Sequence, residues 1–121
     1  MASIRTAVVT LPPVILDIIT TLLPNRAMLD VVAQLPDRMD IEARLGAITP
    51  DLVLFGLRDG ETENAAGALL DLLPRTTIIA LSSDGRDAVI HKMRPYRRIF
   101  RNVSPSVLIR FILAKSTRPK I

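Results

Sequence analysis

The side chains that could carry out chemistry are few and scattered. The sequence has no cysteine, so disulfides, thiolate metal sites and cysteine nucleophiles are excluded. His91 is the single histidine, and we expect it on the surface of a helix rather than in a metal or phosphotransfer site. No His, Asp and Glu residues have the spacing of metal ligands, and no glycine-rich phosphate loop is present. We therefore predict no cofactor, no bound metal and no enzymatic activity.

Hydroxyl and carboxylate groups gather in two loops. Ser82, Ser83 and Asp84 follow one apolar run, and Asp59 and Glu61 follow another. The simplest interpretation is that the serines cap a following segment and that the acids are solvated. Because both loops come after expected strands, these groups could also lie at one end of a sheet.

Basic residues are concentrated toward the end of the sequence. After position 85 there are ten Lys and Arg residues against one acid, a net charge of +9, whereas residues 1–85 have a net charge of −5. This polarity predicts an acidic partner or a nucleic acid on one side of the domain, and the alternative is a solvated basic surface. The candidate partner-binding residues are Lys92, Arg94, Tyr96, Arg97, Arg98 and Arg110.

The pattern of apolar runs and turns predicts an α/β fold. The expected strands are Ile4–Leu11, Met28–Leu35, Leu52–Leu57, Thr76–Leu81 and Arg98–Phe100. The expected helices are Val14–Leu23, Met39–Ile48, Ala65–Leu73, Arg86–Met93 and Ser106–Lys115. Their alternation predicts a five-stranded parallel (βα)5 sheet with helices on both faces and the flavodoxin-like strand order 2-1-3-4-5.

Length and composition fit one domain. The 121 residues, 49% of them hydrophobic and 3% aromatic, predict a single unit over 1–121, with a core over 4–114 and a short basic tail over 115–121. The N-terminus lacks the apolar segment of a signal peptide, and no apolar run is long enough to span a membrane. We expect a cytoplasmic protein.

Three local matches give the chain a resemblance to a known family. They are Pro50–Leu54 as the third strand, Ile78–Ser82 as the fourth, and Arg101–Pro105 as the loop that enters the last helix. In order and spacing they resemble the receiver domains of bacterial two-component response regulators, and the resemblance covers 4–114.

The resemblance also shows what this chain lacks. An active receiver has an acidic pair after the first strand, a phospho-accepting aspartate at the end of the third, a Ser or Thr after the fourth and a lysine after the fifth. The positions that match the acidic pair and the acceptor are Thr10, Leu11 and Gly56, which carry no carboxylate. The last two positions are Ser82 and Arg101. Magnesium in such sites takes oxygen ligands with one or two carboxylates, so the resemblance implies a degenerate pseudo-receiver.

Three functions remain open at this point. The first is a phosphorylation-independent signalling module that binds an acidic protein, a kinase, a regulator or a second copy through the basic face formed in receivers by the fourth helix, fifth strand and fifth helix. The second is a transcription-associated regulator that contacts nucleic acid with the same arginines. The third is an active receiver whose acceptor has moved to Asp59 or Asp84.

Overall fold

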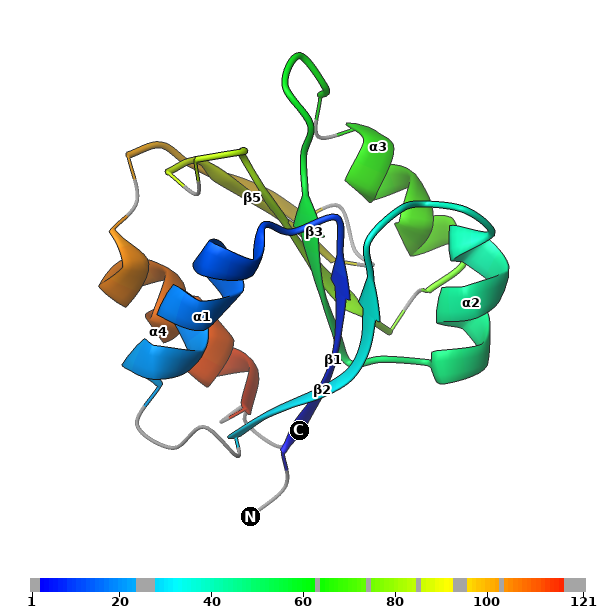
Figure 1. Ribbon diagram of the computed structural model, residues 1–121, viewed down its shortest axis with the longest axis horizontal. Helices are drawn as coiled ribbons and strands as arrows, with labels where there is room; N and C mark the ends of the chain where they lie inside the picture. The colour runs from blue at the N-terminus through cyan, green and yellow to red at the C-terminus, as the bar shows by residue number, and fades with distance from the viewer. Residues whose placement is uncertain are drawn as a thin grey trace.

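A computed structural model describes residues 3–23, 28–62, 64–73, 75–84, 86–92, 96–102 and 104–116. These residues form a central sheet with helices on both faces (Figure 1). The strands are β1 (Ile4–Val9), β2 (Leu29–Leu35), β3 (Leu52–Gly56), β4 (Thr77–Leu81), β5 (Ala88–Lys92) and β6 (Tyr96–Phe100). The helices are α1 (Pro13–Leu22), α2 (Ile41–Ile48), α3 (Asn64–Gly67), the 3-10 helix η2 (Ala68–Asp71) and α4 (Pro105–Ser116).

The sheet has the strand order β2-β1-β3-β4-β5-β6. The first four strands are parallel, and β3 and β4 are buried along their whole length. β5 then runs antiparallel to β4, and β6 antiparallel to β5. The predicted α/β class and the order 2-1-3-4-5 are confirmed, whereas the prediction of a purely parallel, five-stranded sheet is wrong.

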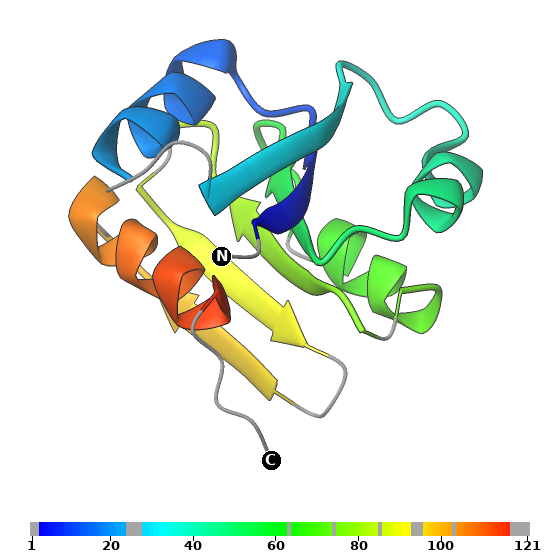
Figure 2. The ribbon, with the colours of Figure 1, turned by 90° about the horizontal axis from the view of Figure 1, so that it is seen from below.

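Two helical layers enclose the sheet. α1 and α4 cover one face and α2, α3 and η2 the other, as Figure 2 shows. Alternation along β3 places Leu52 and Leu54 in the core beneath α1 and α4, and Val53 and Phe55 in the core on the opposite face. Nearly all of this core is aliphatic, as the composition predicts.

The predicted fourth helix is absent, and β5 takes its place. The expected helix Arg86–Met93 falls on Ala88–Lys92, which pairs with β4 from Ile78↔His91 to Leu81↔Ala88. Val89 and Ile90 are β-branched and favour a strand over a helix. Only residues 93–95 separate β5 from β6, a spacing that suits a hairpin. Of the five predicted helices, the other four are present, and the third is half 3-10 in character.

Two helix ends have recognisable capping contacts. α4 begins at Pro105, and the Ser104 hydroxyl accepts a hydrogen bond from the Val107 N–H at 3.3 Å. α2 ends at Ile48, and the capping residue Thr49 has a left-handed backbone whose N–H donates to the Leu45 carbonyl at 2.9 Å. Among the described residues no helix is long and apolar enough to cross a membrane.

Candidate functional site

The carboxyl ends of β1 and β3 touch directly. A Cβ atom at position 56 would lie 2.4 Å from the Thr10 carbonyl oxygen and 2.9 Å from the Leu11 Cα. Both are backbone atoms, which cannot swing aside as a flexible side chain can. Thr10 itself has φ +48°, a left-handed conformation that a β-branched residue rarely adopts. The structure therefore brings Thr10, Leu11 and Gly56 together, and the contact leaves no room for a side chain at position 56.

An arginine from the loop after β2 closes this end of the sheet. The Arg38 Nη2 donates to the Gly56 carbonyl at 2.8 Å and to Glu61 Oε1 at 2.7 Å, with a longer contact of 3.2 Å to the Thr10 hydroxyl. The Thr10 hydroxyl donates to the same Gly56 carbonyl at 2.7 Å. Arg38 also pairs with the second Glu61 oxygen through Nη1 and stacks its guanidinium 4.3 Å from the centre of the Phe55 ring. We call Thr10, Arg38, Gly56 and Glu61 the closed pole.

The ion pair of the closed pole is largely shielded from solvent. The side chains of Arg38 and Glu61 are 16% and 21% exposed. The Arg38 hydrogen bond holds the pKa of Glu61 below its ordinary value of 4.5; burial opposes this, and a bond from the Arg58 N–H reinforces it. That N–H donates to Oε1 at 2.9 Å, so Glu61 also fixes the start of the loop after β3. The carboxylate is thus ionised and fully engaged by this chain.

Ser82 holds the turn between β4 and β5. Its hydroxyl donates to Asp84 at 2.7 Å and accepts from the Asp87 N–H at 3.0 Å. Bonds from the Arg86 N–H, chiefly, and from the Ser82 hydroxyl lower the pKa of Asp84. The hydroxyl of Ser83 donates to Asp59 at 2.8 Å, joining this turn to the loop after β3. The loop acids therefore lie at the same end of the sheet as expected, and each engages neighbouring groups.

Arg101 is not brought to the closed pole. It follows β6 and is exposed, and the adjacent Asn102 N–H donates to Asp87 at 3.2 Å. Because β4 and β5 lie between β3 and β6, three strand spacings separate Arg101 from Gly56, roughly 14 Å. Had the expected helix formed in place of β5, the separation would be two spacings.

The described candidate partner-binding residues lie in the β5–β6 hairpin and in α4. Lys92 ends β5, Tyr96, Arg97 and Arg98 belong to β6, and Arg110 is exposed on α4. Arg94 lies outside the described residues. Four of the six candidates therefore lie in the β5–β6 hairpin, whereas Arg110 lies on a helix.

His91 differs from its expected position. It lies on β5 and is only 6% exposed. Its imidazole lies against α3, where a Cβ atom at Gly67 would come within 3.2–3.3 Å of two ring atoms. The glycine therefore allows α3 to approach the ring closely, and the prediction of an exposed, helical histidine is wrong.

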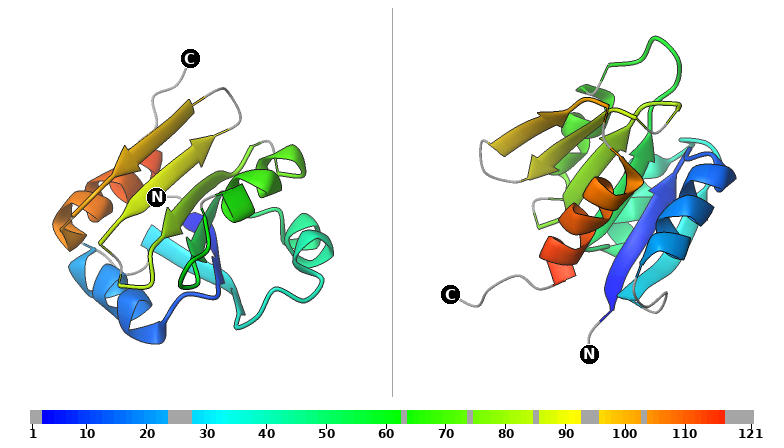
Figure 3. Two further views of the ribbon diagram at one scale, coloured as in Figure 1. Left: turned by 90° about the horizontal axis from the view of Figure 1, so that it is seen from above. Right: turned by 90° about the vertical axis from the view of Figure 1, so that its left-hand side faces the viewer.

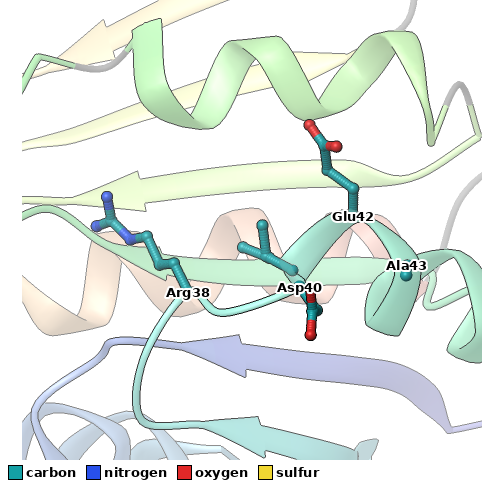
Figure 4. Close-up of a pocket in the computed structure, with 5 residues that line it drawn as sticks. Arg38, Asp40, Glu42 and Ala43 are labelled. Carbon is teal, nitrogen blue, oxygen red and sulfur yellow. The ribbon is translucent and has the colours of Figure 1, made fainter.

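A shallow hollow lies beside the start of α2. Arg38, Asp40, Ile41, Glu42 and Ala43 line it, and Figure 4 shows the carboxylates of Asp40 and Glu42 directed to opposite sides. Its polar groups do not converge on one point. Within the described ranges, no three His, Asp or Glu side chains gather so as to hold a metal ion.

The ion pair between Arg38 and Glu61 was not predicted from the sequence: Arg38 was not named, and Glu61 was expected to be a solvated loop acid. Arg38 follows β2 in the turn Pro36-Asp37-Arg38, and Glu61 sits in the polar loop after β3. Loops that follow parallel strands meet at one end of a sheet, so an arginine in one loop and an acid in another are the sequence signal that could have indicated this pair.

Searches of protein-family models, curated proteins and solved structures found no match to this chain.

Proposed function

We propose that this chain is a pseudo-receiver, a regulatory module that works without phosphorylation and without catalysis, by binding another protein. The single observation that carries the proposal is the contact between Gly56 and the backbone of Thr10 and Leu11. The position that matches the phospho-acceptor of a receiver is not merely a glycine here but one that no larger residue can replace without displacing backbone atoms.

The ion pair of the closed pole supports the same proposal. In an active receiver this end of the sheet gathers carboxylates around a metal ion; here Arg38 supplies the only described cation that contacts the Gly56 carbonyl. The guanidinium satisfies that carbonyl and Glu61 together, so the local charges are balanced by the chain itself. Among the described residues, the one carboxylate of the closed pole, Glu61, is already paired with Arg38 and is not free to ligate a metal ion or to accept a phosphoryl group.

The charge and residue types of the C-terminal third support binding to a protein. The segment that contains β5, β6 and α4 carries the positive charge of the C-terminal third, and Arg86 before β5, Arg101 after β6 and Arg110 on α4 are exposed. Arginine next to tyrosine, as at Tyr96 and Arg97, is a combination enriched in interface hot spots. Charge complementarity then points to an acidic surface on the partner.

The experiment is incubation of the purified chain with acetyl phosphate and Mg²⁺, followed by intact-mass measurement and sedimentation. We expect no added phosphoryl mass and the same sedimentation with and without the reagents. A phosphoryl adduct that disappears in Asp59→Asn or Asp84→Asn would assign a displaced acceptor and contradict the proposal.

Capture experiments test the partner. The chain immobilised at low salt is expected to retain acidic proteins from the cells that produce it, and Arg97→Glu/Arg98→Glu should release them. Retention of nucleic acid with a steep loss of affinity between low and high salt would instead favour the regulator that contacts phosphates.

A further inference from the structure

The two edges of the sheet differ in regularity. β2 forms one edge, and its pairing with β1 jumps from Thr6↔Val31 to Ala7↔Ala33, so Val32 is an extra residue in the edge strand. Such bulges interrupt the ladder and discourage further pairing. β6 forms the other edge, and its five pairs with β5 continue without a shift. Only β6 therefore presents a regular edge.

The outer side of β6 is uncovered in the part of the chain that the structure describes. Figure 3 (left) shows β6, in gold, as the outermost strand, with α4 on one face of the sheet rather than beyond its edge. In an antiparallel ladder alternate residues direct N–H and C=O away from the partner, so part of the β6 backbone has no partner within the sheet. This row of groups is a template for one more strand.

The charge of this edge selects the occupant. β6 contains Arg97 and Arg98 and no acid, and along the sequence residues 92–101 contain five basic residues and no acid. Pairing with β6 of a second copy would oppose like charges, which destabilises neighbouring strands. An extended segment rich in Asp or Glu would instead be attracted electrostatically to these basic residues.

One described side chain offers an apolar contact. Ile99 is 43% exposed and pairs with Val89, which is 9% exposed, so the apolar surface of β5 continues outward onto β6. An added strand that alternates acidic and β-branched residues would cover Ile99 with its apolar face and place its acids on the opposite face of the sheet, which is the face of Arg98.

We propose that β6 binds an extended acidic peptide as a seventh strand of the sheet. The inference rests on the proposed function, because it assigns to the acidic partner a mode of binding. Backbone hydrogen bonds to β6 supply affinity, and the basic residues exclude self-pairing while selecting an acidic sequence.

The test titrates the full chain at low salt with a labelled peptide of alternating Glu and Val. Two further peptides carry N-methyl groups on the odd or on the even amides, and a fourth alternates Lys and Val. We expect the first peptide to bind, one of the two methylated peptides to bind at least about tenfold more weakly than the other, and the Lys-Val peptide not to bind.

Two variants with the same change of charge locate the site. Arg98→Glu on β6 should weaken binding of the Glu-Val peptide at least about tenfold, whereas Arg44→Glu, on the exposed side of α2, should leave it within about twofold. Backbone amide shifts that move in 96–100 on binding would support the site further. Both variants are checked for an unchanged unfolding midpoint.

Three results would overturn the inference. Equal binding of both methylated and the unmodified peptides would mean a contact of charges alone, which leaves the proposed function standing. No binding of the Glu-Val peptide to the wild-type chain would remove the edge as an acidic-peptide site. A concentration-dependent dimer with amide shifts in 96–100 would give the edge to a second copy. Failure of the proposed function is separately visible as a phosphoryl adduct.

Discussion

The closed pole and the β6 edge belong to the same small sheet, but their polar groups differ in whether they are hydrogen-bonded within the chain. At the closed pole, the Gly56 carbonyl, the Thr10 hydroxyl and the Glu61 carboxylate are all engaged by groups of the chain itself. At the β6 edge, a row of backbone groups and a run of basic residues have no partner strand among the described residues. In one region these three acceptor groups are bonded within the chain, and in the other the backbone groups face outward without a partner strand.

The contrast separates stability from recognition. Polar groups that are paired inside a fold stabilise it and are costly to disturb, because removing one partner leaves the other buried without a hydrogen bond. Polar groups left at an edge add little to folding and remain available to a ligand. Substitutions at the closed pole should therefore change the free energy of unfolding, and substitutions at the edge should change binding.

The largest effect is expected from Gly56→Ala. The added methyl group would overlap backbone atoms of Thr10 and Leu11, so β1 and β3 must separate locally, at a cost of roughly 3 kcal/mol. Urea unfolding followed by circular dichroism measures the change. A variant as stable as the wild type would show that the two loops yield easily, and the steric argument against an acceptor would be lost.

Arg38→Met should rank second. It leaves the Gly56 carbonyl and Glu61 without their shared donor, and we expect a loss of about 2 kcal/mol. Arg38→Lys should recover only part of this, because an ammonium cannot reproduce the forked contact or the stacking on Phe55. Arg44→Met on the exposed side of α2 is the control, with an expected change within about 0.5 kcal/mol.

The third prediction concerns pH. Because Arg38 lowers the pKa of Glu61 in the folded chain, the ionised carboxylate stabilises the fold above the ordinary value of 4.5, and this contribution is lost as the pH falls through the folded pKa. Glu61→Gln should therefore be less stable than the wild type by about 1 kcal/mol at neutral pH. The difference should shrink below pH 4.5, and a constant difference from pH 7 to 3 would contradict the ion pair.

Gly46→Ala is expected to act in the opposite direction. Gly46 lies within α2, and a Cβ atom there would meet nothing within 4 Å. Alanine should therefore raise the free energy of unfolding by about 0.5–1 kcal/mol through helix propensity. This variant is the matched control for Gly56, since the same chemical change is made at an open glycine.

The smallest effect is expected at the edge. Ile99→Thr keeps a β-branched residue in β6 and removes apolar surface that is already 43% exposed, so stability should change by about 0.5 kcal/mol or less. Binding of the Glu-Val peptide should fall by several-fold, measured by fluorescence anisotropy. A large loss of stability with unchanged binding would reverse the comparison between the two regions.

Most of the parallel half of the fold was predictable from periodicity. β3 is an apolar run between turn residues, and the expected helices Val14–Leu23 and Ser106–Lys115 agree with α1 and α4 to within one residue at each end. The segment 86–93 was not predictable in the same way, because Ala88–Lys92 is short and its pattern suits a helix or a strand. Pairing with the already buried β4 decided the outcome, a tertiary effect that local propensity does not contain.

The candidate site was predictable in position but not in content. The loops after β1, β3 and β4 were expected to meet at one end of the sheet, and Thr10, Gly56 and Ser82 lie there. The pairing of Arg38 with Glu61 depends on how two loops cross, 23 residues apart in sequence. No spacing rule encodes that contact. The displacement of Arg101 likewise follows from β5, which the sequence pattern did not distinguish from a helix.

The replacement of a helix by β5 has a consequence for the order in which the sheet assembles. Residues 10–51 separate β1 from its neighbour β3, whereas β5 follows β4 after residues 82–87 and β6 follows β5 after 93–95. Contacts between segments close in sequence form faster than those that must close long loops. In pulsed hydrogen exchange during refolding, the amides of Val89 and Ile90 should gain protection before those of Val8 and Val53. The strands at the open edge would then form before the rest of the sheet during folding, while the closed pole is still unformed.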